Sequence, residues 1–178
     1  QLIASEPNMD EDTRKEFSAI IQKNTEELMQ LVNDVLDLSR LEANMMKFQI
    51  QEYDAVALCN DAIYMARMRN EETIEIYFDT HIETQPITTD TGRLIQALVS
   101  TLTYPQKNTT HREITFTLTR DDSGKQICFR ISNSPLADPE FNSQEVSIRH
   151  DINRLLLQHF GGSYNITADE QERPVINF

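Results

Sequence analysis

A heptad repeat of apolar residues in the first quarter of the chain constrains the fold more than any other feature. From about Asp10 to Met46 the pattern is that of one long helix. Its repeated positions, alternately four and three residues apart, are Phe17, Ile21, Asn24, Leu28, Leu31, Val35 and Leu38. This spacing predicts the seam of a coiled coil or helical bundle. A helix of this length has no core of its own, so we expect it to pair with a second copy in a homodimer.

Three further apolar residues, Ile20, Val32 and Leu41, are expected to widen this stripe. The polar residue on the seam, Asn24, has two explanations of equal weight. It either fixes the register and oligomeric state, as a buried asparagine does in some coiled coils, or it is a tolerated polar residue near the helix end.

The rest of the chain, residues 47–178, switches to mixed helix and strand signals and predicts an α+β protein. Helices on one face of a mixed sheet would form an α/β sandwich, and about 130 residues can bury an adequate core. The expected elements are a strand at 48–50, a helix after an Asp54 cap to about 70, a strand at 74–78, a helix after an Asp90 cap, a hairpin over 114–131, a helix over 148–160 ending at Gly161, and a closing hairpin over 163–178.

Charge and composition exclude several classes of partner. Acidic residues outnumber basic ones by 29 to 16, for a net charge of −13, which argues against nucleic acid and against an anionic membrane surface. No apolar run approaches the roughly 18 to 20 residues of a membrane span, so we expect no direct membrane contact. The chain begins at Gln1, which indicates a fragment, and a membrane anchor upstream stays compatible with a cytoplasmic location. Cys59 and Cys128 show no paired spacing, which fits a reducing compartment, and the four histidines show no metal-ligand spacing.

Three segments resemble sensor histidine kinases. Residues 35–43 (VLDLSRLEA) resemble the end of the second dimerisation helix of that family, and residues 90–98 (DTGRLIQAL) resemble a helix of its ATP-binding domain. Residues 152–162 resemble the last helix of that domain with its double glycine. The resemblance implies that residues 1–46 contain the second helix of a dimerisation domain, and that the first helix of that domain lies upstream. It also implies a histidine kinase ATPase domain of the GHKL (Bergerat) type over residues 47–178.

The family binds Mg-ATP through three sequence boxes, and the resemblance implies that this chain departs from each. At the magnesium-binding asparagine of the first box stands Tyr104, a poor ligand for an ion that prefers carboxylate, amide or phosphate oxygens. Pro105 follows and would end the helix, whereas Lys107 of the same box is kept.

The second and third boxes depart further. In the second, Asn133 replaces the adenine-binding aspartate, and Pro135 and Ala137 replace two glycines. In the third, the glycine positions fall on Glu145, Ser147 and Arg149, so a negative charge stands where phosphates would bind. The resemblance therefore implies a vestigial nucleotide site made of Tyr104, Lys107, Asn133, Pro135, Ala137 and Arg149, with no catalytic residue, no metal and no cofactor.

Three functions remain open. The leading hypothesis is a pseudokinase of a two-component phosphorelay, which signals through dimerisation and through docking to a response regulator or another signalling protein. The alternative is an active sensor histidine kinase that uses Mg-ATP to phosphorylate a histidine upstream of Gln1, because none of the four histidines has the context of a phosphoacceptor. A third hypothesis is a remodelled pocket, lined by Tyr104 and Arg149, for a different small ligand.

Overall fold

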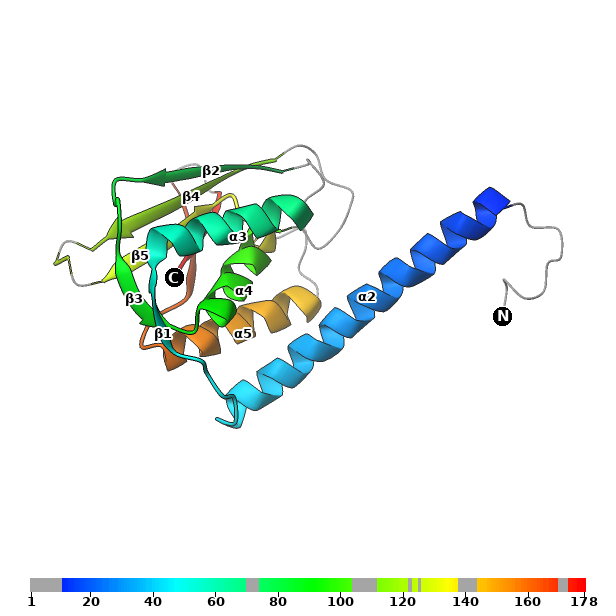
Figure 1. The fold of residues 1–178 in the computed structure, drawn as a ribbon, viewed down its shortest axis with the longest axis horizontal. Helices are drawn as coiled ribbons and strands as arrows, with labels where there is room; N and C mark the ends of the chain where they lie inside the picture. Colours follow the sequence, from blue (N-terminus) through cyan, green and yellow to red (C-terminus); the bar gives the residue numbers. More distant parts are fainter. Residues whose placement is uncertain are drawn as a thin grey trace.

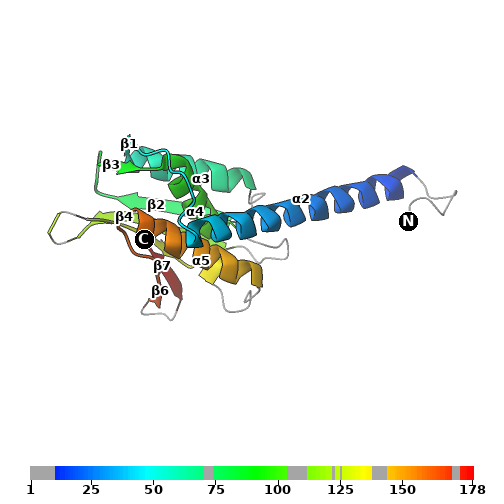
Figure 2. The same cartoon turned by 90° about the horizontal axis from the view of Figure 1, so that it is seen from below.

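The computed structural model describes residues 11–69, 74–103, 112–121, 123–124, 126–137, 144–169 and 173–178. Helix α2 (Glu11–Glu42) is a long rod, and the remaining elements form an α/β unit that we call the α/β domain (Figure 1). Only the C-terminal part of α2 lies beside that domain, against helix α5 (Gln144–His159) (Figures 1 and 2). The expected order, a long helix followed by an α/β sandwich, is confirmed.

The larger sheet has five strands in the order β2-β4-β5-β7-β6. Its strands are β2 (Ile74–Thr80), β4 (Arg112–Arg120), β5 (Ile127–Ser132), β6 (Asn165–Ala168) and β7 (Pro174–Asn177). β2 and β4 are parallel and the other pairs are antiparallel, so the sheet is mixed. Both expected hairpins, β4–β5 and β6–β7, are confirmed.

One face of this sheet carries the core. Along β4 the side chains of Ile114, Phe116 and Leu118 are buried, whereas those of Glu113 and Thr115, directly before the first two, are exposed. This alternation places every second side chain under the helices. Helices α3 (Ala55–Arg69), α4 (Thr91–Leu102) and α5 complete the core from that side, and Leu58, Leu98 and Leu156 are buried.

Asp90 caps α4 as expected. Its Oδ1 accepts from the backbone N–H of Arg93 at 3.0 Å, which satisfies one of the free donors at the helix start. Its Oδ2 accepts from the N–H of Gln49 at 2.8 Å, so the same carboxylate also fixes the segment that follows α2.

The strand expected at residues 48–50 is wrong by three positions. The strand is β1 (Gln51–Asp54), which pairs with β3 (Pro86–Thr89) in a separate two-stranded sheet. Residues 48–50 are not a strand because their contacts are elsewhere: the Phe48 ring packs on His159 and Phe160, at 5.2 and 5.3 Å between ring centroids. β3 was not predicted at all, and α5 begins four residues earlier than the pattern indicated.

Leu41 also differs from its prediction. It was expected to widen the apolar stripe of α2, but it is 2% exposed and belongs to the core of the α/β domain. It lies on the side of α2 that faces α4 and α5.

Candidate functional site

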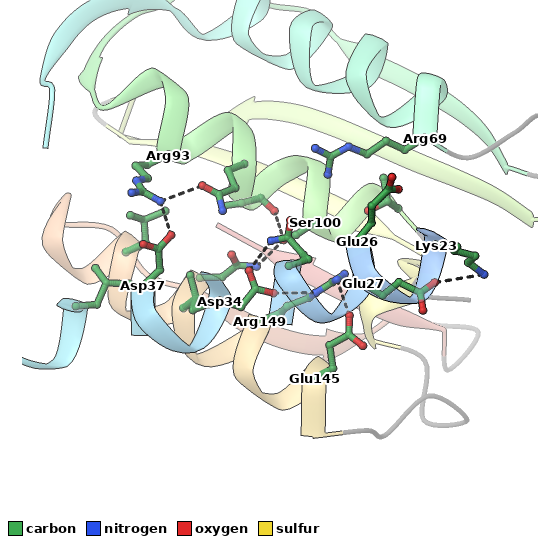
Figure 3. A pocket seen from close by; sticks show the side chains of 18 of the residues that line it. Lys23, Glu26, Glu27, Asp34, Asp37, Arg69, Arg93, Ser100, Glu145 and Arg149 are labelled. Atoms are coloured by element: carbon green, nitrogen blue, oxygen red, sulfur yellow. Dashed lines mark hydrogen bonds and ion pairs between the residues drawn. The ribbon is translucent and has the colours of Figure 1, made fainter. Parts of the chain in front are cut away.

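A cavity of about 940 Å³ lies between α2 and helices α3, α4 and α5 (Figure 3). Leu41, Ile152 and Leu156 form part of its apolar lining, and Ser100 and Asn153 supply polar groups. The charged side chains that line it come from both sides, and they are Glu16, Lys23, Glu26, Glu27, Asp34 and Asp37 from α2 and Arg69, Arg93, Glu145 and Arg149 from the α/β domain.

The residues of α2 that line this cavity form a second heptad stripe, which we call the charged stripe. Its members, again four and three residues apart, are Glu16, Ile20, Lys23, Glu27, Gln30, Asp34, Asp37 and Leu41. Seven of these eight stand one position before a residue of the apolar stripe, and Leu41 continues the row beyond the last of them. Because an α-helix turns by about 100° per residue, the two stripes lie about 100° apart. Sequence reasoning missed the charged stripe, although its spacing was visible.

The most buried ion pair in the cavity joins Asp34 of α2 to Arg149 of α5. Asp34 Oδ2 lies 3.6 Å from Arg149 Nε, and the two side chains are 6% and 17% exposed. Asp34 Oδ1 also accepts from Gln30 Nε2 at 2.7 Å, and the Arg149 guanidinium donates to Glu145 at 2.6 Å. The Arg149 cation therefore has carboxylates on two sides.

A second pair reaches α4 one helical turn further along α2. Arg93 donates to Asp37 Oδ2 at 2.6 Å and to Gln96 Oε1 at 3.1 Å, and Asp37 also lies 3.6 Å from Arg40. With Leu41, the residues that attach α2 to the α/β domain follow the spacing i, i+3 and i+7, which places all three on one face of the helix.

The turn at the second box is held by the protein itself. The Asn133 backbone has φ 60°, and its side-chain amide donates to the carbonyl of Glu113 at 2.8 Å. The buried Ser134 hydroxyl donates to the carbonyl of Thr101 at 2.7 Å. The 3-10 helix η1 (Pro135–Ala137) follows, with Pro135 and Leu136 buried.

His150 attaches α5 to η1. Its Nε2 lies 3.1 Å from the carbonyl of Leu136, and its Nδ1 lies 2.6 Å from the Tyr164 hydroxyl. A carbonyl can only accept, so Nε2 carries the proton and Nδ1 accepts from Tyr164. Burial lowers the pKa of His150, with the hydrogen bond to Leu136 acting in the opposite direction. Burial also raises the pKa of the Tyr164 hydroxyl.

The predicted site residues within the described ranges do not all line the cavity beside α2. Arg149 lines the cavity beside α2, whereas Asn133, Pro135 and Ala137 form the separate turn described above. Tyr104 and Lys107 lie outside the described residues, as do Pro105 and the segment 138–143.

The apolar stripe of α2 faces solvent in this single chain. Phe17, Ile21, Leu28 and Val35 are 44 to 60% exposed, and Leu31 and Leu38 are half-buried. The dimerisation expected from this stripe stays a prediction.

Other sites are few in the described part of the chain. Within those ranges, no group of three or more His, Cys, Asp and Glu side chains could hold a metal ion. Both cysteines are free, and burial raises the pKa of the Cys59 thiol to about 12, so it stays protonated and unreactive. None of the described helices is long and apolar enough to cross a bilayer.

No model of a known protein family matches the chain. Among curated proteins, it is 26% identical over 119 residues to hybrid signal transduction histidine kinase A of Dictyostelium discoideum, a match that covers 66% of this chain and 6% of that protein. It is 36% identical over 73 residues to the sensor-like histidine kinase ycf26 of Pyropia yezoensis, which covers 40% of this chain and 11% of that protein. The chain thus spans a small part of the length of these relatives.

Solved structures of histidine kinases share the fold over almost the whole chain. The histidine kinase AdeS of Acinetobacter baumannii superposes with a TM-score of 0.69 at 15% identity, covering 99% of this chain and 87% of that one. The chain is therefore similar in sequence to histidine kinases and shares their fold.

Two other similar structures are complexes of histidine kinases, one with a nucleotide analogue and one with a protein. Full-length ShkA, in complex with AMPPNP, has a TM-score of 0.68 at 19% identity, covering 96% of this chain and 39% of that one. The histidine kinase ThkA, in complex with the response regulator TrrA, has a TM-score of 0.64 at 16% identity, covering 96% of this chain and 52% of that one. At these identities the likeness concerns the fold alone, so the activity of this chain must be argued from its own residues.

Proposed function

We propose that this chain is the signalling part of a histidine kinase-like protein that works by dimerisation and protein docking rather than by ATP turnover. One observation carries the proposal. Arg149, which stands at the last glycine position of the third box, is engaged by Asp34 and Glu145 in the cavity against α2. A guanidinium that already neutralises two carboxylates attracts a phosphate less strongly.

The charge around that position supports the same conclusion. Six carboxylates and four cations line the cavity, so acidic groups exceed basic ones where the third box faces α2. Phosphoryl transfer depends on cations that neutralise the phosphates, and an acidic wall opposes them.

The second box supports the proposal from the adenine side. The Asn133 NH2 group donates to the backbone carbonyl of Glu113, which leaves its Oδ1 as an uncharged acceptor in place of a carboxylate, and Pro135 lacks a backbone donor. We therefore assign no cofactor, and Mg-ATP belongs to this chain only under the alternative of an active kinase.

The apolar stripe of α2 is the surface we assign to homodimerisation, because it is exposed in the single chain. For the docking partner we propose a response regulator, by analogy with the ThkA–TrrA complex. We also propose a cytoplasmic place of action, on the resemblance to sensor histidine kinases alone, whether or not the full-length protein has an anchor upstream.

Calorimetry and thermal melting with Mg-ATP test the loss of nucleotide binding. We expect no heat and no shift in melting temperature up to millimolar Mg-ATP. A ligand at 100 times its dissociation constant would add about 2.7 kcal/mol of stability, a shift of several degrees for a chain of this size. An active histidine kinase in the same plate is the control.

Magnesium-dependent binding, or phosphate incorporation by the full-length protein beside that active control, would support the active kinase instead.

A further inference from the structure

We propose that the Asp34–Arg149 and Asp37–Arg93 pairs form an ionic latch that determines where the α/β domain sits on α2. This inference deepens the proposed docking function and rests on it: a position that serves phosphate binding in relatives would here serve the attachment of two parts of the molecule. The latch is defined by these four residues, which lie at the end of the cavity where α2 meets α4 and α5 (Figure 3).

Burial makes the latch selective. The Asp34 side chain is 6% exposed and that of Arg149 is 17% exposed, so both ions have lost most of their water. Such a pair adds little compared with two apolar side chains, but removing one partner leaves an uncompensated buried charge. Asp34 would keep only Gln30 as a neutral donor. The domain can therefore dock where both cations meet both carboxylates, and is penalised where they do not.

The apolar contact of α2 with the domain is confined to the same short segment. On α2 only Leu41 and Asp34 are buried, and the remainder of the helix extends away from the domain (Figure 1). Further up the charged stripe, Lys23 and Glu27 pair with each other at 3.3 Å rather than with the domain. The position of α2 is thus held by a short segment of eight residues, 34–41.

The latch is compatible with the dimer proposed above. Because the charged and apolar stripes lie about 100° apart on α2, a partner helix on the apolar stripe leaves the charged stripe open. Docking of the domain and pairing of the helices can proceed on the same helix together.

Amide hydrogen exchange on α2 tests the latch. We expect Arg149→Gln to speed exchange at residues 30–42 about tenfold, because the docked helix opens more often. Arg154→Gln is the matched control: it lies on the same helix and removes the exposed Arg154–Asp151 pair at 2.6 Å. That variant is expected to leave exchange in α2 within twofold of the parent chain. Arg149→Gln rates equal to those of Arg154→Gln would overturn the latch.

A variant pair with exchanged charges distinguishes loss of the latch from a general loss of folding. Asp34→Arg alone should undock α2, and Asp34→Arg combined with Arg149→Asp should return exchange at residues 30–42 toward the parent rate. A double variant no better than the single one would count against the latch. The same measurement with Mg-ATP is a separate arm: protection of the α/β domain of the parent chain by nucleotide would refute the proposed function, whereas the latch is decided by the variants without nucleotide.

Discussion

The His150 imidazole joins three parts of the α/β domain, since it belongs to α5, contacts η1 through Leu136 and accepts from Tyr164. It therefore helps to hold the second-box turn against α5. No sequence signal pointed to this role: a lone histidine on a helix has no pattern, and its partners lie 14 residues away in either direction.

We expect the free energy of unfolding of the domain to decrease as the pH is lowered, because His150 becomes protonated. Burial holds the pKa of His150 below its ordinary value of 6.5. The unfolded chain therefore binds the proton more readily, so the contribution of the neutral imidazole is complete above pH 6.5 and is lost as pH falls through the folded pKa. Between the two pKa values the free energy of unfolding should fall by up to about 1.4 kcal/mol per pH unit.

Urea denaturation at pH 7.5 and pH 5.0 measures this loss. His150→Gln should lose less stability between the two pH values than the parent chain, and His159→Gln, an exposed position on the same helix, should lose as much as the parent. Arg154 and Asp151 also act on His150, in opposite directions, and both variants leave them in place. Equal losses in all three proteins would exclude His150 as the cause.

At the scale of elements, the end of α5 was predictable from the sequence. Gly162 N–H donates to the carbonyl of Leu157 at 2.8 Å and Gly161 N–H donates to Gln158 at 3.1 Å, the two bonds of a Schellman cap. Gly161 has φ 76°, a conformation that other residues adopt with strain. Helix geometry thus explains Gly161, whereas Gly162 lies so close to Leu157 that an added Cβ would be 3.2 Å from its Cδ1.

Gly161→Ala should lower the free energy of unfolding by about 1 kcal/mol, because alanine disfavours positive φ and nothing nearby would compensate. Gly92→Ala is the control, since this glycine lies within α4 and an added Cβ would meet only Asp90 Oδ1, at 3.5 Å. That change should be neutral or stabilising. Thermal unfolding of both variants and the parent chain measures the difference in stability. A Gly161→Ala protein as stable as the parent would contradict the expected cost of placing alanine at this positive φ.

Other elements were less predictable. The spacing of apolar residues indicated α3, α4 and the β4–β5 hairpin, because each buries one face. β1 and β3 were misplaced or missed because they are four residues long, pair only with each other and bury little, so no alternation distinguishes them. The charged stripe of α2 was missed for a different reason: its partners Arg93 and Arg149 are 56 and 115 residues away from Asp37 and Asp34, and only the fold brings them together.

For the whole molecule, the exposed apolar stripe predicts self-association. Leu28, at 60% exposed, is its most accessible large member. Leu28→Lys should weaken the dimer at least tenfold, since it places like charges on a seam that would otherwise bury leucine.

Analytical ultracentrifugation over a range of concentrations measures the dimer constant. Asn33→Lys is the matched control, because it adds the same charge to an exposed position of α2 outside both stripes. A chain that is monomeric at every concentration, or a dimer that is equally weakened by both variants, would refute this assignment of the interface.

The two neighbouring stripes of α2 also set a rule for anyone who joins a new input module to this helix. An added or deleted residue turns everything upstream by about 100° relative to the α/β domain, which is the angle between the stripes. A junction shifted by one residue would therefore align the input module with the charged stripe where it should align with the apolar stripe, or the reverse. Junctions that differ by seven residues, two turns of the helix, keep nearly the same phase. Chimeric receptors built on this chain should accordingly respond with a seven-residue period in linker length.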